Sequence, residues 1–536
     1  MQRLHVFSLF ILACLSGCAR HATMVETGNR DQVLHYGNKD EPSDMDPHIN
    51  TANSTSKILM ALFEGLVTMS NDGRTVLPGV AERWEISPDG LTYTFHLRAG
   101  ATWSNGAPIT ARDFVDSFLR LIDPQLGCEQ AGYAFPVHGA RDFLEGRSKD
   151  PATVAYRAPD PRTVVIVLDH PAPYFLGLLT TYSFDPVYMP SLNANGGRHQ
   201  RGGPWTLPGV LVSNGPFVLS EWKPNAYVSV KRNPNYWGAS RVRLAEVRFY
   251  PTDNESAEER AFRAGQLHVT TSLPKTKIEA YDAEHASEFH VIEALRTNYL
   301  TFNVHKAPFT DARVRRAFAL AIDREQLVHA ALGKLGAPAH SFVRPGTAGY
   351  TPPEVFSFAP DEARRLMSEA GYPGGAGFPT VEFTLNGNTG VTVSVAEVIQ
   401  QMWTHNLGVE VTLRPLEFKV YLSTEREKQF EVVMEGWSSG IVDPRDLMEL
   451  AVSNDPNNDA GASLPDFDAA FAAADATADP KRRAADFDLM ERINAREVVY
   501  APLYYSNTGF LVHPSVRGWR DNAIDTIDWR ELYLAP

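Results

Sequence analysis

The chain has 536 residues, of which 43% are hydrophobic and 21% are charged, and its formal net charge is −14. These fractions are ordinary for a globular protein, and the length favours about two to four domains. Nucleic-acid binding requires Lys and Arg clustered on one face, so the acidic balance argues against a nucleic-acid partner.

The first residues predict export. Arg3 precedes an apolar run over residues 6–15, which is long enough for a signal peptide but shorter than the roughly 20 residues of a membrane span. The run ends in a Leu-Ser-Gly-Cys sequence that resembles the bacterial lipobox, in which the cysteine is lipidated and the chain is cut just before it. We predict a signal peptide at 1–17, lipidation at Cys18 and a tether at 18–32. An ordinary cleavage site followed by a chance cysteine is the alternative.

Attachment to the membrane is expected through the lipid alone, because no later stretch approaches about 18 consecutive apolar residues. Ala19 follows the anchor, and resemblance to Gram-negative lipoproteins then implies the periplasm and the inner leaflet of the outer membrane. Processing removes Cys14 and modifies Cys18, so Cys128 is left as the one ordinary thiol and no internal disulfide is expected.

Alternation of polar and apolar residues predicts strands at 92–98 and 227–231. The continuous apolar run at 163–168 predicts a strand that is buried on both faces. Glycine and proline are frequent at 193–208, which predicts a long loop or a domain junction.

The C-terminal half has an α/β pattern. Strands are predicted at 381–385 and 409–413, and between them helical spacing of apolar residues predicts a helix over 393–407 that Gly408 ends. This is a βαβ unit, so the two strands should be parallel. A compact helix is also predicted over 361–371.

A further strand is predicted at 430–435, and it runs into a loop at 436–443. Ligands of open α/β sheets bind beyond the carboxyl ends of strands, so this loop is the predicted ligand site. Asp443 also has a structural interpretation, which we favour: it caps a helix that begins at Pro444 and continues through 447–452.

An enzymatic interpretation rests on one motif. Gly436, Ser438 and Gly440 match the Gly-x-Ser-x-Gly pattern of α/β-hydrolases, in which a helix follows the serine at once. Here five residues intervene before a helix can start, and no His-Gly-Gly-Gly motif lies upstream. Metal, nucleotide and zinc motifs are absent from the sequence. We therefore predict no catalytic residue, no cofactor and no metal.

Many segments are similar, in chain order, to the oligopeptide-binding family of ABC-transporter proteins. They include LFEGL at 62–66, WSNG at 103–106, SNGPF at 213–217, the RNPNYW run at 232–237 and KAPF at 306–309. The resemblance implies an α/β fold of the periplasmic-binding-protein type (class II, Venus-flytrap) with three domains and a ligand cleft between two α/β lobes.

The domains implied by the resemblance are a discontinuous lobe I (33–61, 206–295 and 504–536), an inserted domain II (62–205) and lobe III (296–503). It also implies that the lobes close around a small peptide or peptide-like ligand and deliver it to an ABC permease and ATPase complex. We expect a monomer.

In the resembling proteins, the ligand backbone pairs in the manner of an added strand with the loop that matches Gly436, Trp437 and Ser438. A segment of the other lobe, near Asn53, contributes as well. Charged ends of a ligand need counter-charges, because an unpaired ion in a closed cleft costs several kcal/mol.

The sequence differs from the family at the positions that supply these counter-charges. The aspartate that pairs with the peptide amine falls at Gly440, and the basic residue that takes a carboxylate falls at Met434. Asp443 matches the acidic residue before proline, which is not the usual amine partner. Two hypotheses follow: Asp443 or Glu435 substitutes for the missing aspartate, or the ligand has no free amine. A sensor or chaperone on the same fold is a third class.

Overall fold

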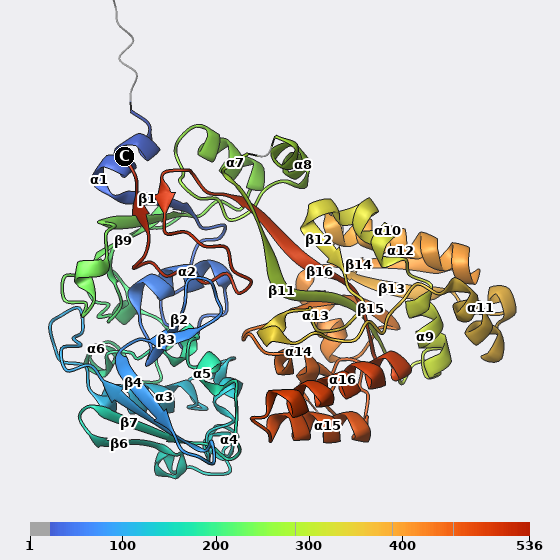
Figure 1. Cartoon of the computed structure of the whole chain (residues 1–536), viewed down its shortest axis with the longest axis horizontal. Coiled ribbons are helices and arrows are strands. Elements are labelled where there is room, and N and C mark those ends of the chain that lie inside the picture. The colour runs from blue at the N-terminus through green and yellow to red at the C-terminus, as the bar shows by residue number, and fades with distance from the viewer. Residues whose placement is uncertain (1–21, 285, 388–389, 454) are drawn as a thin grey trace, which may run out of the picture.

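The computed structural model describes residues 22–284, 286–387, 390–453 and 455–536. The predicted signal peptide, Cys18 and the first part of the tether lie outside these ranges. Among the described residues, no helix combines the length and the apolar character that a membrane span needs. The fold is α/β with two bodies that are joined by two long strands (Figure 1).

The first body contains two units with separate hydrophobic cores. The N-terminal unit has a four-stranded sheet in the order β1-β10-β9-β8, in which only the β1–β10 pair is parallel. The chain ends beside its first helix (Figure 1), where Gln32 Nε2 donates to Leu534 O at 2.7 Å. Its elements are α1 (Met24–Asp31), β1 (Val33–Gly37), α2 (Asn53–Leu62), β8 (Phe217–Lys223), β9 (Tyr227–Arg232), β10 (Glu246–Tyr250), α7 (Glu255–Arg263), α8 (Lys275–Ala283), β17 (Val516–Arg517) and β18 (Tyr533–Leu534).

The inserted unit has an antiparallel sheet in the order β4-β5-β7-β6 and a separate hairpin, β2–β3. Helix α3 packs on this sheet with a capping box in which Thr110 and Asp113 satisfy each other's backbone N–H groups. Its elements are β2 (Val67–Met69), β3 (Val76–Pro78), β4 (Ala81–Ile86), β5 (Thr92–Leu97), α3 (Ala111–Leu121), α4 (Ala140–Leu144), β6 (Tyr156–Asp160), β7 (Thr163–Val167), α5 (Phe175–Leu178) and α6 (Met189–Ala194).

The C-terminal unit is the second body and holds a six-stranded mixed sheet in the order β12-β16-β11-β15-β13-β14. Its elements are β11 (Phe289–Phe302), α9 (Ala312–Leu320), α10 (Arg324–Leu327), β12 (Gly336–Pro338), α11 (Pro360–Glu369), β13 (Val381–Asn386), α12 (Val391–Leu407), β14 (Val411–Leu416), α13 (Phe418–Arg426), β15 (Val432–Ser438), α14 (Arg445–Met448), α15 (Pro465–Asp475), α16 (Pro480–Glu497) and β16 (Tyr500–Leu511).

Strands β11 and β16 connect the two bodies (Figure 1). They pair antiparallel, but the register jumps between the pair Glu293–Asn507 and the pair Thr297–Tyr505. Residues 294–296 therefore lie opposite a single residue of β16. This irregularity is a bulge in β11, and bulges bend and twist a strand. The expected domain boundaries at 295/296 and 503/504 fall inside these strands, and the domain division stays a prediction.

The predicted strands at 92–98, 227–231 and 381–385 are present as β5, β9 and β13. The βαβ unit is confirmed, because β13 and β14 are parallel and α12 lies between them. Gly408 ends α12 in the left-handed conformation with φ 70°. The helix predicted at 361–371 is α11.

Two predictions were wrong in detail. The run at 163–168 is not buried on both faces: in β7, buried and half-buried residues alternate, because the sheet is antiparallel and only one face meets the core. The strand predicted at 430–435 begins at Val432 and continues to Ser438, so the first three residues of the predicted loop belong to β15.

Candidate functional site

The predicted ligand loop starts as a strand beside the strands that connect the bodies. In β15, Gly436, Trp437 and Ser438 pair with Asn298, Thr297 and Arg296 of β11. Ser439 N then donates to Leu295 O at 2.8 Å, within the bulge of β11. The candidate site is thus attached directly to the irregular segment between the two bodies.

Among the residues that the structure describes, no strand neighbours one edge of β15 over the residues of the site. Strand β13 pairs with Val432 and Val433 only, although β11 pairs with β15 as far as Ser438. On the β13 side, the hydroxyl of Tyr421 donates to Met434 O at 3.0 Å. Peptide groups alternate along a strand, so those of Gly436 and Ser438 face the same open edge as that of Met434.

Gly436 lies under two polar side chains of β11. A Cβ at Gly436 would overlap the guanidinium of Arg296 and would lie 2.6 Å from Asn298 Oδ1. Arg296 Nη1 donates to Ser438 Oγ at 3.0 Å, and among the described residues its guanidinium has no acidic partner. Arg296 is therefore a cation beside the open edge. The sequence prediction missed it, because this residue is distant in sequence and reaches the site only through strand pairing.

The chain after β15 is fixed by Asp446. Its Oδ2 accepts the indole N–H of Trp437 at 3.0 Å and the backbone N–H of Gly440 at 3.1 Å. Asp446 is buried, and desolvation raises the pKa of its carboxyl to about 6. Asp446 therefore holds the segment from Trp437 to Gly440 in place.

Gly440 and Ile441 contact the inserted unit across the two bodies. The hydroxyl of Tyr133 occupies the space that a Cβ of Gly440 would take, and Ile441 is buried in the core of the inserted unit. Burial raises the pKa of Tyr133, so its hydroxyl stays neutral at physiological pH. The space that a side chain would take at the position predicted to match the family's aspartate is thus filled by a neutral phenol.

Asp443 is used internally. Both of its carboxylate oxygens accept from Arg483, at 2.6 and 2.8 Å, and Oδ1 also accepts the backbone N–H of Arg445 at 2.9 Å. This last contact supports the capping interpretation, as does the helical backbone of Pro444 (φ −56°, ψ −29°), although the assigned helix α14 begins one residue later, at Arg445. The helix is also shorter than predicted: it ends at Met448 and continues as a single 3-10 turn.

Glu435, the other suggested amine partner, points away from solvent. Its Oε2 accepts from Thr301 Oγ1 at 2.6 Å, and its Oε1 is buried without a hydrogen-bond donor among the described residues. Burial and the neighbouring acids Glu425 and Asp459 raise the pKa of Glu435 well above its ordinary value. The raised pKa disfavours the ionised form of the carboxyl, so Glu435 is a poor partner for an amine.

The remaining predicted residues lie apart from this cluster. Met434 is 6% exposed and packs in the core of the C-terminal unit, so its side chain is a core residue in this conformation. Asn53 is exposed and begins α2 in the other body. Three residues earlier, Asn50 O accepts the hydroxyl of Tyr182 at 3.3 Å, which joins this segment to the inserted unit.

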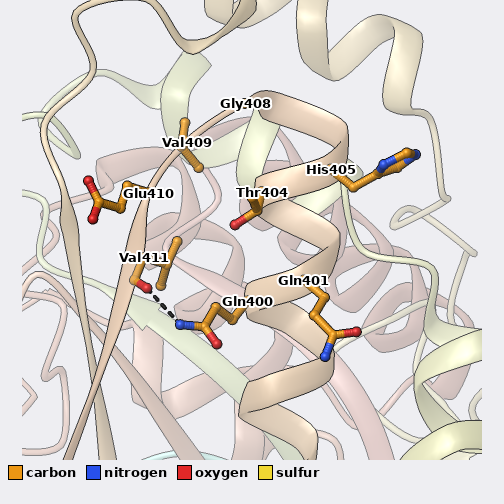
Figure 2. A pocket seen from close by; sticks show the side chains of 8 residues that line it. All are labelled: Gln400, Gln401, Thr404, His405, Gly408, Val409, Glu410 and Val411. Carbon is orange, nitrogen blue, oxygen red and sulfur yellow. Dashed lines mark hydrogen bonds between the residues drawn. The ribbon is translucent and has the colours of Figure 1, made fainter.

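A surface groove of about 600 Å³ lies elsewhere on the C-terminal unit, between α12 and β14 (Figure 2). Gln400 and Thr404 of the helix face Val411 of the strand there, and Gln400 Nε2 donates to Val411 O at 2.7 Å (Figure 2). Strand β14 is two strands away from β15 in the sheet. This groove is therefore separate from the candidate site. Among the described residues, no group of three or more His, Cys, Asp or Glu side chains is arranged to hold a metal.

The structure has two α/β bodies, a bulged pair of connecting strands and an open strand edge beside them. These are features of a two-lobed solute-binding protein. The profile described as "Bacterial extracellular solute-binding proteins, family 5 Middle" matches residues 75–459. The chain belongs to this family.

Relatives match over nearly the whole chain. The periplasmic murein peptide-binding protein MppA of Escherichia coli is 32% identical over 506 residues, which are 92% of each protein. The structure of MppA superposes with a TM-score of 0.81, over 94% of this chain and 98% of that one. The probable deoxycholate-binding periplasmic protein YgiS of the same organism is 32% identical over 521 residues, 94% of each protein. The Haemophilus influenzae OppA complex with the peptide RPPGFSPFR has a TM-score of 0.78 at 30% identity, over 94% of this chain and 99% of that one.

Proposed function

We propose that the protein is the extracytoplasmic ligand-capturing component of an ABC importer and that it binds a peptide or peptide-like ligand. It works with a permease and ATPase complex, as a monomer, without catalysis and without a cofactor. Lipid at Cys18 holds it to the membrane, and in a Gram-negative cell it stays in the periplasm. The open edge of β15 is the observation that carries the proposal.

A ligand in extended conformation pairs with this edge. The peptide groups of Gly436 and Ser438 face it, and β13 does not cover it. Main-chain hydrogen bonds recognise any peptide sequence equally, which suits a transport protein. The names of MppA and OppA, which are similar over more than nine-tenths of the chain, support a peptide ligand.

Closure of the two bodies then buries the ligand. The bulge at 294–296 is the bending point, because regular pairing of β11 with β16 is interrupted there. The segment near Asn53 approaches from the first body. The site residues Gly436, Trp437, Ser438 and Gly440 line the second.

The charges favour a ligand that carries a carboxylate and has no free amine at this site. Within the part of the chain that the structure describes, Arg296 is a cation beside the site that has no acidic partner, so it replaces the family's basic residue, which falls at Met434. Neither of the two suggested acids replaces the missing aspartate, because Asp443 is bound to Arg483 and the ionised form of Glu435 is disfavoured by burial. Of the two hypotheses, this supports the one with an N-blocked, cyclic or otherwise amine-free ligand.

The first test is to purify the soluble chain from Ala19 onward, denature it and identify the released compounds by mass spectrometry. We expect a compound with a carboxylate and a blocked amine. A ladder of short peptides with free amines would support peptide transport but overturn the charge argument.

A non-peptide ligand is the second candidate, and the similarity to YgiS favours it. A single non-peptide compound in the same measurement would select it. Unmodified peptides would then fail to stabilise the protein against heat, because only a bound ligand shifts the unfolding equilibrium.

A further inference from the structure

The inserted unit contacts the C-terminal unit through the ring of Tyr174, which lies just before α5. The guanidinium carbon of Arg445 is 4.8 Å from the centroid of this ring, and that of Arg483 is 5.6 Å from it. Both distances are within the roughly 6 Å at which a guanidinium and an aromatic ring attract each other. Tyr174 is buried, and the attraction is stronger where water is excluded.

The two arginines are held in place by their own unit. Arg445 binds Glu449 at 2.7 Å and Asp475 at 2.9 Å, and Arg483 binds Asp443 at 2.6 Å. Each guanidinium also lies over a phenylalanine ring of the same unit, at 5.1 and 5.0 Å from the centroid. None of these contacts involves the inserted unit, so the arginine pair keeps its arrangement when the two bodies separate.

Tyr174 contributes its ring alone to this contact. Its hydroxyl is buried and has no hydrogen-bond partner among the described residues. The same two units also meet where the hydroxyl of Tyr133 lies against Gly440 and where Ile441 enters the core of the inserted unit. Gly440 and Ile441 belong to the predicted ligand loop, so the contact between the units is connected to the candidate site.

We propose that Tyr174 is a positioning residue that holds the two bodies in contact around the ligand, through the faces of Arg445 and Arg483. Separation of the bodies exposes the ring to water and removes its attraction to both guanidinium groups, so the contact favours the closed arrangement. A ligand that binds only the closed arrangement is then bound more tightly, because a larger fraction of the protein is ready to hold it. The effect on ligand binding rests on the proposed function, whereas the effect on the shape of the ligand-free protein does not.

The test combines small-angle X-ray scattering of the ligand-free protein with the dissociation rate of N-acetyl-trialanine, a peptide that has a carboxylate and a blocked amine. In Tyr174→Leu we expect a larger radius of gyration than in the wild type and about tenfold faster dissociation, which corresponds to about 1.4 kcal/mol. Equal radii of gyration would overturn the proposal. A larger radius with no binding of the peptide to either protein would support the role of Tyr174 and contradict the proposed ligand class.

Two control variants separate this contact from the general loss of a buried side chain. Tyr174→Phe keeps the ring and removes only a hydroxyl without a described partner, so it should behave like the wild type. Tyr156→Leu removes another buried tyrosine of the same core, one that packs against Phe118 within the inserted unit. It should lower stability and leave the radius and the rate unchanged.

The proposal is overturned if either control variant shows the same changes as Tyr174→Leu. Ile441→Ala weakens the contact from the side of the C-terminal unit. It decides the question if Tyr174→Leu does not fold: a larger radius of gyration supports the proposal, and an unchanged one contradicts it.

Discussion

The hydroxyl of Tyr133 occupies the space that a Cβ of Gly440 would take, across the contact between the inserted unit and the C-terminal unit. The packing against Tyr133 thus requires glycine at 440. The same glycine leaves the site without the carboxylate that the resemblance to the family predicts at this position. A side chain at 440 and the phenol at 133 exclude each other, and this couples the site's charge to the contact between the two bodies.

Restoring the aspartate therefore needs two changes. Gly440→Asp alone should lower stability without improving the binding of free peptides, because the new side chain collides with Tyr133. With Tyr133→Ala added, the carboxylate has room, and we expect about tenfold tighter binding of a tripeptide than of its N-acetylated form. Isothermal titration calorimetry of the single and the double variant measures these peptide affinities. Tighter binding by the single variant would show that Tyr133 is no obstacle.

Arg296 should bind the ligand's carboxylate. Replacing it by Ala removes a charge-assisted hydrogen bond worth about 1.5–3 kcal/mol, so affinity for a carboxylate ligand should fall roughly ten- to a hundredfold. A ligand whose carboxylate is converted to an amide should bind both proteins alike. Arg365→Ala, which changes an exposed arginine of α11, is the matched control. Equal affinities for both ligand forms in the wild type would refute the role of Arg296.

Gly436 should not accept a side chain. Gly436→Ala forces Arg296 and Asn298 to move, which we expect to cost about 1–3 kcal/mol of unfolding free energy and to weaken ligand binding. Gly100→Ala has no atom within 4 Å of the new methyl and should be nearly neutral. Urea unfolding of both variants measures the difference, and equal stabilities would argue against the close packing at 436.

The pair formed by Asp443 and Arg483 should be structural. Their side chains are 6% and 10% exposed, so Asp443→Asn leaves a buried guanidinium without its counter-charge. A loss of about 3–5 kcal/mol in unfolding free energy is expected. Asp361→Asn, at a side chain that is 96% exposed, should change stability little. A stable Asp443→Asn variant with altered ligand affinity would instead favour Asp443 as an amine partner.

His268 should make the protein sensitive to acid. Burial, with the neighbouring His35 and His513, lowers the pKa of His268 to about 3, below the roughly 6.5 of an unfolded chain. Its neutral form therefore contributes stability that is complete above about pH 6.5 and is lost as the pH falls towards about 3, with a slope of at most about 1.4 kcal/mol per pH unit.

His268→Asn should flatten that pH dependence. Unfolding free energies between pH 7 and 4 should decline less in the variant than in the wild type. His138→Asn, at an exposed histidine that pairs with Asp169, serves as the matched control. Parallel curves for wild type and His268→Asn would contradict the assignment.

The local sequence pattern was sufficient to predict much of the fold. Alternation in 92–98 and helical spacing in 393–407 are properties of neighbouring residues, so strand, helix and the parallel βαβ unit could be predicted. The motifs at 62–66 and 232–237 also indicated the family, which the profile match confirms. The same pattern predicted a ligand site in one segment, 436–443, because a strand in an α/β unit presents its carboxyl end to ligands, and this site stays a prediction.

Only the tertiary structure shows which residues contact each position of the segment 436–443. Arg296 lies 140 positions before Gly436, and only the pairing of β11 with β15 brings them together. Tyr133 fills the place beside Gly440 because two separate units meet there. From its sequence alone, the chain could be seen to carry no charge at Gly440. The groups around Gly440 could not be predicted, because hydrogen bonds and ion pairs between distant segments depend on the packing of the whole chain.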